Sequence, residues 1–170
     1  IAKNQGNIIK TTGDGMLVEF QSVTDAARCA IEIQERMRRR NSDVANDRRI
    51  DFRIGINLGD IIFEDGDIYG DGVNIAARVE QLAEIGGICV TAAVHDQIDG
   101  RVDVAFEDLG EKLLKNISRP VRLYRLVVAP PEQGPGGAHA VTKAAVVKPT
   151  VAVLPFTNMS GDPEQEFFAD

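Results

Sequence analysis

The chain has 170 residues, of which 44% are hydrophobic and 26% charged, a balance typical of a soluble globular protein with a buried core. Its formal net charge of -7 argues against a nucleic-acid binder or a protein that contacts anionic membranes, since both need a basic face. No apolar run approaches the roughly 20 residues of a membrane-spanning helix.

The first predicted element is a hairpin around KTTGDGMLVEF, residues 10–20. Short β-rich or apolar runs flank Asp14, which stands between two glycines. Asp and Gly tolerate the positive φ of a tight turn, so this spacing predicts a hairpin tip. Taken alone, the stretch explains Asp14 by the turn and requires no function for it.

A helix is predicted next, over residues 22–41, with Ser22 as its N-cap and Asp25 as the capping-box partner. Ala26, Ala30, Ile33 and Met37 recur at a helical period. The basic end of this segment suits the negative pole of a helix and is interpreted as a solvated last turn.

The middle of the chain alternates strands and helices. DFRIGINLGDIIFE predicts two strands in a hairpin broken at residues 57–59, and residues 73–85 predict a helix that ends at Gly86. A buried strand, a short helix and two further strands are expected at 87–92, 92–98, 102–110 and 121–128. This order predicts an α/β sandwich of a mixed sheet and helices.

Isolated cysteines and histidines give no metal or disulfide pattern. Cys29 and Cys89 lie far apart in apolar surroundings, which favours buried reduced thiols of a cytosolic protein. His95 and His139 have no Cys, Asp or Glu at ligand spacing, so we interpret both as structurally incidental.

The composition changes near Ala129. Residues 129–149 are rich in Pro, Gly and Ala and predict a flexible linker. PTVAVLPF then restores a strand pattern. A single strand cannot form a core, so residues 150–170 are expected to open a second domain, and residues 1–128 form the first.

DGDIYGDGVNIAARVE, residues 65–80, is the second unusual stretch. Asn74 and Arg78 stand at positions i and i+4, which places an amide and a guanidinium on one helical face. Such a pair can neutralise a phosphoryl group. The alternative is a surface arginine on an amphipathic helix, and the loop has no P-loop spacing.

Several stretches together resemble the catalytic domain of class III nucleotidyl cyclases, the adenylate and guanylate cyclases. They are KTTGDGMLVEF, FRIGINLGDII, DIYGDGVNIAARVE, GGICVT and LGEKLLKNISRPVRLYRL, and they cover residues 1–128 in order. The resemblance implies a ferredoxin-like mixed sheet with helices. It also implies conversion of ATP to 3′,5′-cyclic AMP and pyrophosphate in intracellular signalling.

The resemblance assigns roles to individual residues. Lys10 and Asp67 match the residues that read the adenine ring. Asn74 and Arg78 match those that position the ribose and stabilise the transition state. Lys115 falls where the family places a lysine on the terminal phosphates.

Asp14 matches the second of two aspartates that hold a pair of Mg²⁺ or Mn²⁺ ions in this family. The first lies on a strand before the hairpin, and this chain starts after that strand and its following helices. The resemblance therefore implies a sheet without a central strand and an incomplete metal site. Next to Lys115, the family often has Gly where this chain has Asn116.

A homodimer with shared active sites is also implied, with no nucleic acid and no membrane contact in this segment. One alternative is a guanylate cyclase, in which Glu and a small residue such as Cys usually stand at the positions of Lys10 and Asp67. The other is a cyclase-like nucleotide-binding or dimerisation module without turnover. VAVLPFTNMSGDPEQEFFAD resembles the opening of a TolB-like domain, which suggests a bacterial cytoplasmic signalling protein.

Overall fold

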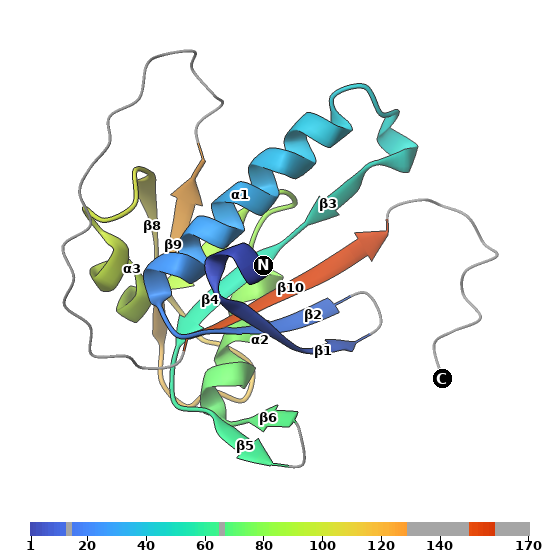
Figure 1. The fold of residues 1–170 in the computed structure, drawn as a ribbon. Helices are drawn as coiled ribbons and strands as arrows, with labels where there is room; N and C mark the ends of the chain where they lie inside the picture. Colours follow the sequence, from blue (N-terminus) through green and yellow to red (C-terminus); the bar gives the residue numbers. More distant parts are fainter. Residues whose placement is uncertain (13–14, 65–66, 129–149, 159–170) are drawn as a thin grey trace.

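A computed structural model describes residues 1–12, 15–64, 67–128 and 150–158, with residues 12, 63, 64, 67 and 150–158 described through their backbone. The helices are α1 (Val23–Asn41), α2 (Asp71–Leu82) and α3 (Ala92–Ile98), with short 3-10 turns at Ala2–Asn4 and Asn46–Arg48. The strands are β1 (Gly6–Thr12), β2 (Gly15–Phe20), β3 (Ile50–Phe52), β4 (Ile54–Leu58), β5 (Ile62–Glu64), β6 (Asp67–Tyr69), β7 (Ile88–Thr91), β8 (Ala105–Lys112), β9 (Val121–Val127) and β10 (Thr150–Asn158) (Figure 1).

The main sheet is mixed, in the order β1-β2-β10-β4-β7-β9-β8, and β3 also pairs with β10. β4 and β7 run parallel, whereas the other neighbours run antiparallel. β5 and β6 form a separate ribbon. The predicted α/β sandwich with a mixed sheet is confirmed.

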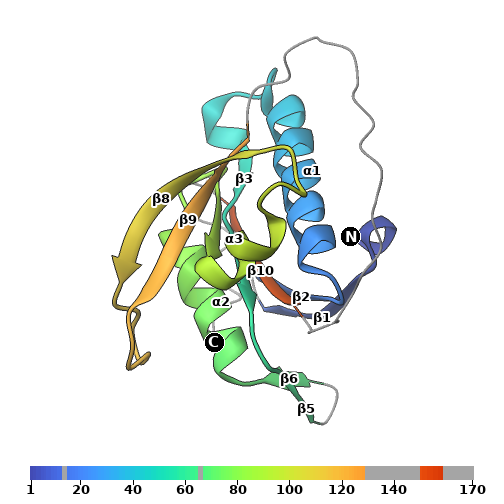
Figure 2. The ribbon, with the colours of Figure 1, turned by 90° about the vertical axis from the view of Figure 1, so that its left-hand side faces the viewer.

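Helices cover both faces of the sheet (Figures 1 and 2). Val18, Ile56 and Val90 are fully buried in one cluster with residues of α1 and α3. Leu17 and Cys89 are neighbours of Val18 and Val90 along their strands, and they join clusters that contain residues of α2. This division follows from the strand period, because successive side chains point to opposite faces.

The predicted N-cap of α1 is confirmed, since the Ser22 side chain accepts a hydrogen bond from the Asp25 backbone N–H at 3.3 Å. Further along α1, the buried Gln34 amide donates to the carbonyls of Phe52 and Gly87, both at 3.0 Å. These bonds satisfy a polar group inside the core and connect α1 to β3 and to the turn before β7.

The predicted hairpin at residues 57–59 is wrong. β4 pairs with β10 on one side and β7 on the other, while β5 pairs with β6. Both edges of β4 are therefore occupied, and β5 has no place beside it. Asn57 is a buried residue of β4 and not a turn residue.

The predicted gap in the centre of the sheet is also absent, because β10 lies between β2 and β4 and pairs with both (Figure 1). Residues 150–158, expected to open a second domain, thus contribute a strand to the sheet of residues 1–128. The division into two domains and a linker stays a prediction, and residues 129–149 lie outside the described part.

Cys29 and Cys89 are free and buried, as the sequence indicates. Burial raises the pKa of the Cys89 thiol to about 11, because the apolar surroundings disfavour the thiolate. The His95 ring stacks on Tyr124 with 3.9 Å between centroids, so it packs as part of an aromatic cluster. His139 lies outside the described residues.

Helix α2 contacts β4 backbone to backbone at Gly55. A Cβ atom built on Gly55 would lie 2.3 Å from the Glu80 nitrogen and 2.5 Å from the Ala76 carbonyl oxygen. Both are backbone atoms, which cannot rotate away as a side chain does. The absence of a side chain at position 55 therefore fixes how closely α2 approaches the sheet.

A buried polar bridge holds the first turn of α2. The Asn57 amide donates to the Gly72 carbonyl at 3.0 Å, and the Thr91 hydroxyl donates to the Asn57 side-chain oxygen, also at 3.0 Å. Asn57 and Thr91 are only 4% and 3% exposed, so water does not replace these partners. The bridge links β7, β4 and α2.

Gly55→Ala should destabilise the fold by about 3 kcal/mol, because the backbone of α2 must move to admit a methyl group. Gly100→Ala is the matched control. Gly100 has a φ of 70° and nothing within 4 Å of a built Cβ, so only conformational strain of roughly 1–2 kcal/mol is expected. Urea unfolding measures both, and equal costs would contradict the close contact of α2 with β4.

Thr91→Val should cost about 1–3 kcal/mol, although valine has nearly the same shape, because it removes the donor to the buried Asn57 oxygen. Thr11→Val, at an exposed position of β1, is the control and should stay within about 0.5 kcal/mol of the unsubstituted chain. If the two variants unfold at the same urea concentration with unchanged slope, the bridge contributes nothing to stability.

Candidate active site

The predicted site residues come from separate elements. Lys10 lies on β1, Asp67 begins β6, Asn74 and Arg78 lie on α2, and Lys115 follows β8. The predicted metal ligand Asp14 lies outside the described residues, and Asp67 is described through its backbone. The fold brings β1, β6, α2 and the segment after β8 into the following contacts.

Lys10 and β6 lie side by side. The Lys10 ammonium nitrogen is 5.8 Å from the centre of the Tyr69 ring, within cation–π range. Asp67 is two positions before Tyr69 on this short strand, and Gly70 then leads directly into α2. The fold therefore brings one predicted base-reading residue beside the strand that carries the other.

Asn74 and Arg78 project from consecutive turns of α2, as the spacing predicts. Asn74 is exposed, and Arg78 is half-buried. The Arg78 guanidinium donates to the Gln81 side-chain oxygen at 3.1 Å, one turn further along the same helix. Among the described residues this is the one hydrogen-bond partner identified for the Arg78 guanidinium, which has further donors.

The loop of Lys115 packs against the second half of α2. Leu114 is buried in one cluster with Val79 of that helix and with Ala83, which follows it. Lys115, the next residue after Leu114, is exposed, and Val79 is the next residue after Arg78. Asn116 has a φ of 65°, a left-handed conformation that Gly adopts freely and Asn tolerates. The Asn at this position therefore suits the same backbone that Gly would.

An ion pair joins the strands on either side of this loop. The Arg122 side chain of β9 donates to both carboxylate oxygens of Asp108 on β8, at 3.2 and 3.3 Å from Nε. These hydrogen bonds hold the pKa of Asp108 below its usual range. The pair is exposed, so its contribution to stability is small.

Metal ligands do not gather in the described part of the chain. Within residues 1–12, 15–64, 67–128 and 150–158, no three His, Cys, Asp or Glu side chains form a metal-binding group. β10, beside the predicted hairpin, has the sequence TVAVLPFTN without a carboxylate. The described residues therefore contain no such cluster, and the assignment of Asp14 stays a prediction.

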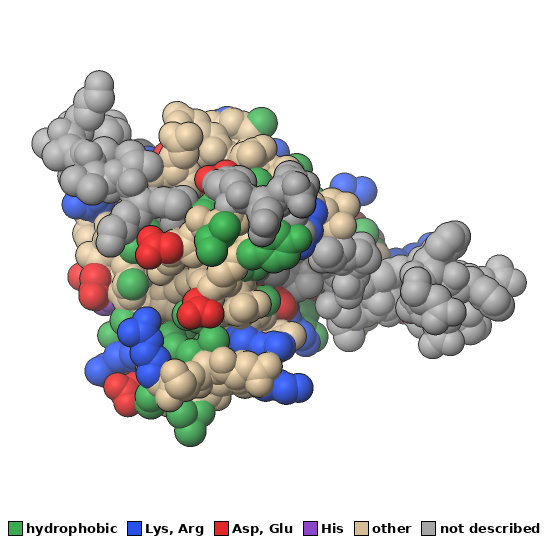
Figure 3. Space-filling view, turned by 90° about the horizontal axis from the view of Figure 1, so that it is seen from below, with side chains coloured by type: hydrophobic (Ala, Val, Ile, Leu, Met, Phe, Trp, Pro, Cys, Tyr) green, Lys and Arg blue, Asp and Glu red, His purple; other side chains and the backbone are tan. Residues whose placement is uncertain are grey.

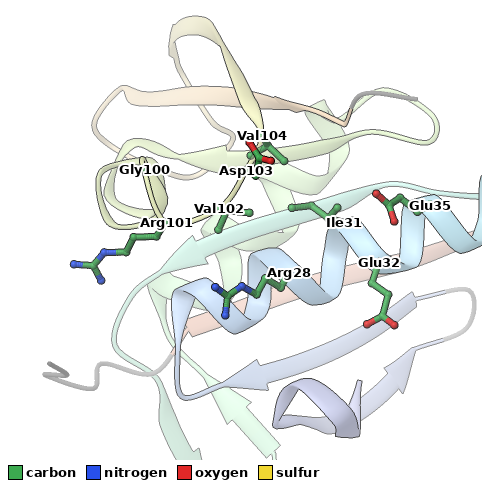
Figure 4. A pocket seen from close by; sticks show the side chains of 9 residues that line it. All are labelled: Arg28, Ile31, Glu32, Glu35, Gly100, Arg101, Val102, Asp103 and Val104. Carbon is green, nitrogen blue, oxygen red and sulfur yellow. The ribbon is translucent and has the colours of Figure 1, made fainter. Parts of the chain in front are cut away.

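A hollow of about 630 Å³ lies away from these residues, between α1 and the loop after α3 (Figure 4). Arg28, Glu32 and Glu35 reach it from α1, and Arg101 and Asp103 from the loop. None of the predicted site residues lines it. Its charges are of both signs and Arg101 extends outward, so the hollow presents no converging set of groups for a nucleotide.

Two features of the site were missed by the sequence analysis. The sequence predicts a loop at Tyr69, although the DIY run, with an apolar and an aromatic residue, is also compatible with a strand. It predicts a turn at Asn57. Its bonds to Gly72 and Thr91 join residues far apart in the chain, so no local pattern could reveal them.

The end of the molecule that carries β5 and β6 is seen in Figure 3. Acidic and basic side chains form separate small groups there, with hydrophobic side chains between them. Ile62 and Tyr69 of this ribbon are 62% and 50% exposed. The described residues on this face therefore form no continuous basic surface of the kind that binds a nucleic-acid backbone.

Among the described helices, none combines the length and the apolar character needed to cross a membrane.

Comparison with known proteins identifies the family. Residues 1–127 match the model of the adenylate and guanylate cyclase catalytic domain. A Rhizobium meliloti protein named "Putative adenylate cyclase 3" is 45% identical over 179 aligned positions, which cover 98% of this chain. The chain spans 29% of the length of that relative.

Solved structures give the same result. An adenylate/guanylate cyclase/hydrolase from Silicibacter pomeroyi is 52% identical, with a TM-score of 0.70 over 74% of this chain and 75% of that one. The adenylyl cyclase CyaB from P. aeruginosa is 25% identical, with a TM-score of 0.59 over 78% and 77%. The prediction of a ferredoxin-like mixed sheet is confirmed, and the chain belongs to the family of adenylate and guanylate cyclase catalytic domains.

Proposed function

We propose that the chain is the catalytic part of an adenylate cyclase, a lyase that converts ATP to 3′,5′-cyclic AMP and pyrophosphate in intracellular signalling. The position of Lys10 over Tyr69 carries this proposal, because it places Lys10 beside the strand of Asp67. The name of the Rhizobium meliloti relative agrees with this choice of nucleotide.

In this proposal the adenine base is recognised by one side chain that donates a hydrogen bond and one that accepts a hydrogen bond. Lys10 donates to adenine N1, and Asp67 accepts from the exocyclic amine. Guanine presents a protonated N1 and a carbonyl at these positions, so it would leave both side chains without a partner. A mismatch of this kind costs the desolvation of each group, which makes the pair selective for ATP.

In this proposal the ribose and the phosphates of the nucleotide are bound by α2 and by the loop that contains Lys115. Asn74 positions the ribose, and Arg78 exchanges its bond to Gln81 for the oxygens of the α-phosphate, where negative charge grows in the transition state. A guanidinium suits this task because its forked donors match two oxygens at once. Lys115 binds the terminal phosphates and helps pyrophosphate to leave.

The proposal includes a divalent cation, Mg²⁺ or Mn²⁺, held by Asp14. When bound, such an ion offsets phosphate charge and activates the ribose 3′-hydroxyl. A carboxylate at the tip of a short hairpin suits this role, since Mg²⁺ needs hard oxygen ligands in strict geometry.

A homodimer with shared sites is part of the same proposal. Ile8, Ile62 and Tyr69 are 48%, 62% and 50% exposed, and Tyr69 contacts Lys10. An isologous interface over these side chains would cover apolar surface. It would also let each hairpin offer Asp14 to one site and Lys10 to the other.

A second candidate is supported by the composition of β10. The strand beside β2 carries no Asp or Glu, so in this form of the chain nothing there can assist Asp14 with metal ions. Residues 1–170 are then a nucleotide-binding module without turnover. Purified residues 1–170 should form no cyclic AMP from ATP with Mg²⁺ or Mn²⁺, and robust formation would rule this candidate out.

Base choice is tested in an extended domain, in which a family segment carrying the first strand and its aspartate precedes Ile1. We expect at least about tenfold faster cyclisation of ATP than of GTP, because a lost hydrogen-bonded pair costs 1.4 kcal/mol or more. The control is the double variant Lys10→Glu with Asp67→Cys, which should reverse the preference. Equal rates with both nucleotides, or no change in the double variant, would contradict the assigned roles.

Site sharing is tested by mixing two inactive variants of the extended domain, Asp14→Ala and Arg78→Ala. A mixed dimer would combine both lesions in one site and leave the other intact. Mixing should restore up to about a quarter of the unsubstituted activity, because half of the dimers are mixed and each has one good site. A mixture that exchanges subunits and stays inactive would show that each chain completes its own site.

A further inference from the structure

The loop that joins β8 to β9 carries positive charge that no acidic residue of the same stretch offsets. Lys112, Lys115, Arg119 and Arg122 all lie within positions 112–122, which contain no Asp or Glu. The whole chain, by contrast, has a formal net charge of -7. A local excess of basic charge on an acidic protein indicates a place where an anion can bind.

The basic residues of the strand and of the loop differ in their partners. On the strands, Arg122 of β9 pairs with Asp108 of β8. In the loop, Lys115 and Arg119 are exposed, and neither forms an ion pair with any residue that the structure describes. Two cations in one loop repel each other, and a bound anion would relieve this repulsion.

The backbone is fixed on both sides of Lys115. The Ile117 N–H donates to the Leu114 carbonyl at 3.0 Å, which closes a turn, and Asn116 at the third position of this turn has a φ of 65°. A type II turn requires a positive φ at that position. Leu114 is 6% exposed, and Ile117 packs against the same buried cluster. Lys115 is therefore the exposed corner of an anchored turn, so an anion can bind without the cost of ordering the backbone.

This turn lies against α2 (Figures 1 and 2). Leu114 and Val79 belong to one buried cluster, and Val79 directly follows Arg78 on the helix. Lys115 directly follows Leu114. The loop therefore adds its positive charge beside the helix that carries the arginine assigned to the α-phosphate.

Arg119 is held in the same loop. Lys112 pairs with Val121, so residues 113–120 form a loop whose two ends are joined by the ladder. Pro120 directly follows Arg119, and its ring restricts the backbone before β9 begins. Arg119 and Lys115 are four positions apart within this closed loop, which keeps their charges near each other.

A short chain of phosphates suits this loop better than a large polyanion. A guanidinium binds two phosphate oxygens at once, and an ammonium adds a compact charge beside it. The strand that leads into the loop carries Glu107, Asp108 and Glu111, all exposed. These carboxylates would repel a long polyanion that extends beyond the loop.

We propose that Arg119 is a second phosphate-binding residue, which together with Lys115 binds the diphosphate or triphosphate chain of a nucleotide. The resemblance assigns a phosphate-binding role in this loop to Lys115, and Arg119 adds a forked donor to it. The inference rests on the proposed function for the identity of the nucleotide, and on the geometry and charge of the loop for the site itself.

Calorimetric titration of the 170-residue chain with sodium tripolyphosphate tests the site at low ionic strength, where exposed charges are least screened. The unsubstituted chain should show saturable binding. Lys115→Gln and Arg119→Gln should each weaken it at least about threefold, because each removes a charge-assisted hydrogen bond. Arg38→Gln is the matched control. It removes the same charge from an exposed position of α1 and should change binding by less than about 1.5-fold.

Each result of the titration decides the question. Weaker binding in both loop variants, with the control unchanged, supports the inference. A loss confined to Lys115→Gln would show that Arg119 takes no part. Equal losses in all three variants would show a response to net charge alone, and an unsubstituted chain that binds no tripolyphosphate would overturn the site altogether. The three side chains are exposed, so the variants should keep the melting temperature within about 2 °C.

The same experiment separates this inference from the proposed function. Tripolyphosphate has no base or ribose and cannot be cyclised, so its binding does not depend on the chemistry of the complete site. Selective binding by the loop would stand even if the extended domain formed no cyclic AMP. An extended domain that cyclises ATP with the same KM after Arg119→Gln would overturn the inference and leave the proposed function intact.

Discussion

The close contact of α2 with β4 at Gly55 is the constraint on which the rest of the structure depends. α2 lies directly on β4 there, because the backbone atoms of Ala76 and Glu80 occupy the space that a side chain at position 55 would fill. The bridge from Asn57 to Gly72 and Thr91 then fixes the helix along its axis. The positions of Asn74 and Arg78 therefore depend on how α2 packs on β4 more than on contacts of their own side chains.

Other parts of the candidate site take their positions from the same helix. The loop of Lys115 rests on α2 through Leu114, and β6 leads into the helix through Gly70. Lys10 reaches this assembly by its contact with Tyr69. A shift of α2 would therefore move the groups assigned to ribose, phosphate and base together, which links the stability of the core to the geometry of the site.

Local patterns were sufficient for much of this fold. The cap at Ser22, the apolar period of α1 and the buried run of β7 each depend on neighbours in the chain, and the structure confirms them. Patterns failed where a partner is distant. Asn57 resembles a turn residue until Gly72 and Thr91 are brought beside it. The site residues were found by their family motif, and what the fold adds is the Lys10–Tyr69 contact and the left-handed Asn116.

A central strand that follows the other described strands in the sequence has a consequence for synthesis on the ribosome. In the described sheet the hairpin β1–β2 is joined to the ladder β4-β7-β9-β8 through β10, so this arrangement forms after residue 158 has left the exit tunnel. Until then the nascent chain carries two open strand edges, each able to pair with another chain. Closure must also wait for contacts between the most distant parts of the sequence, which slows folding.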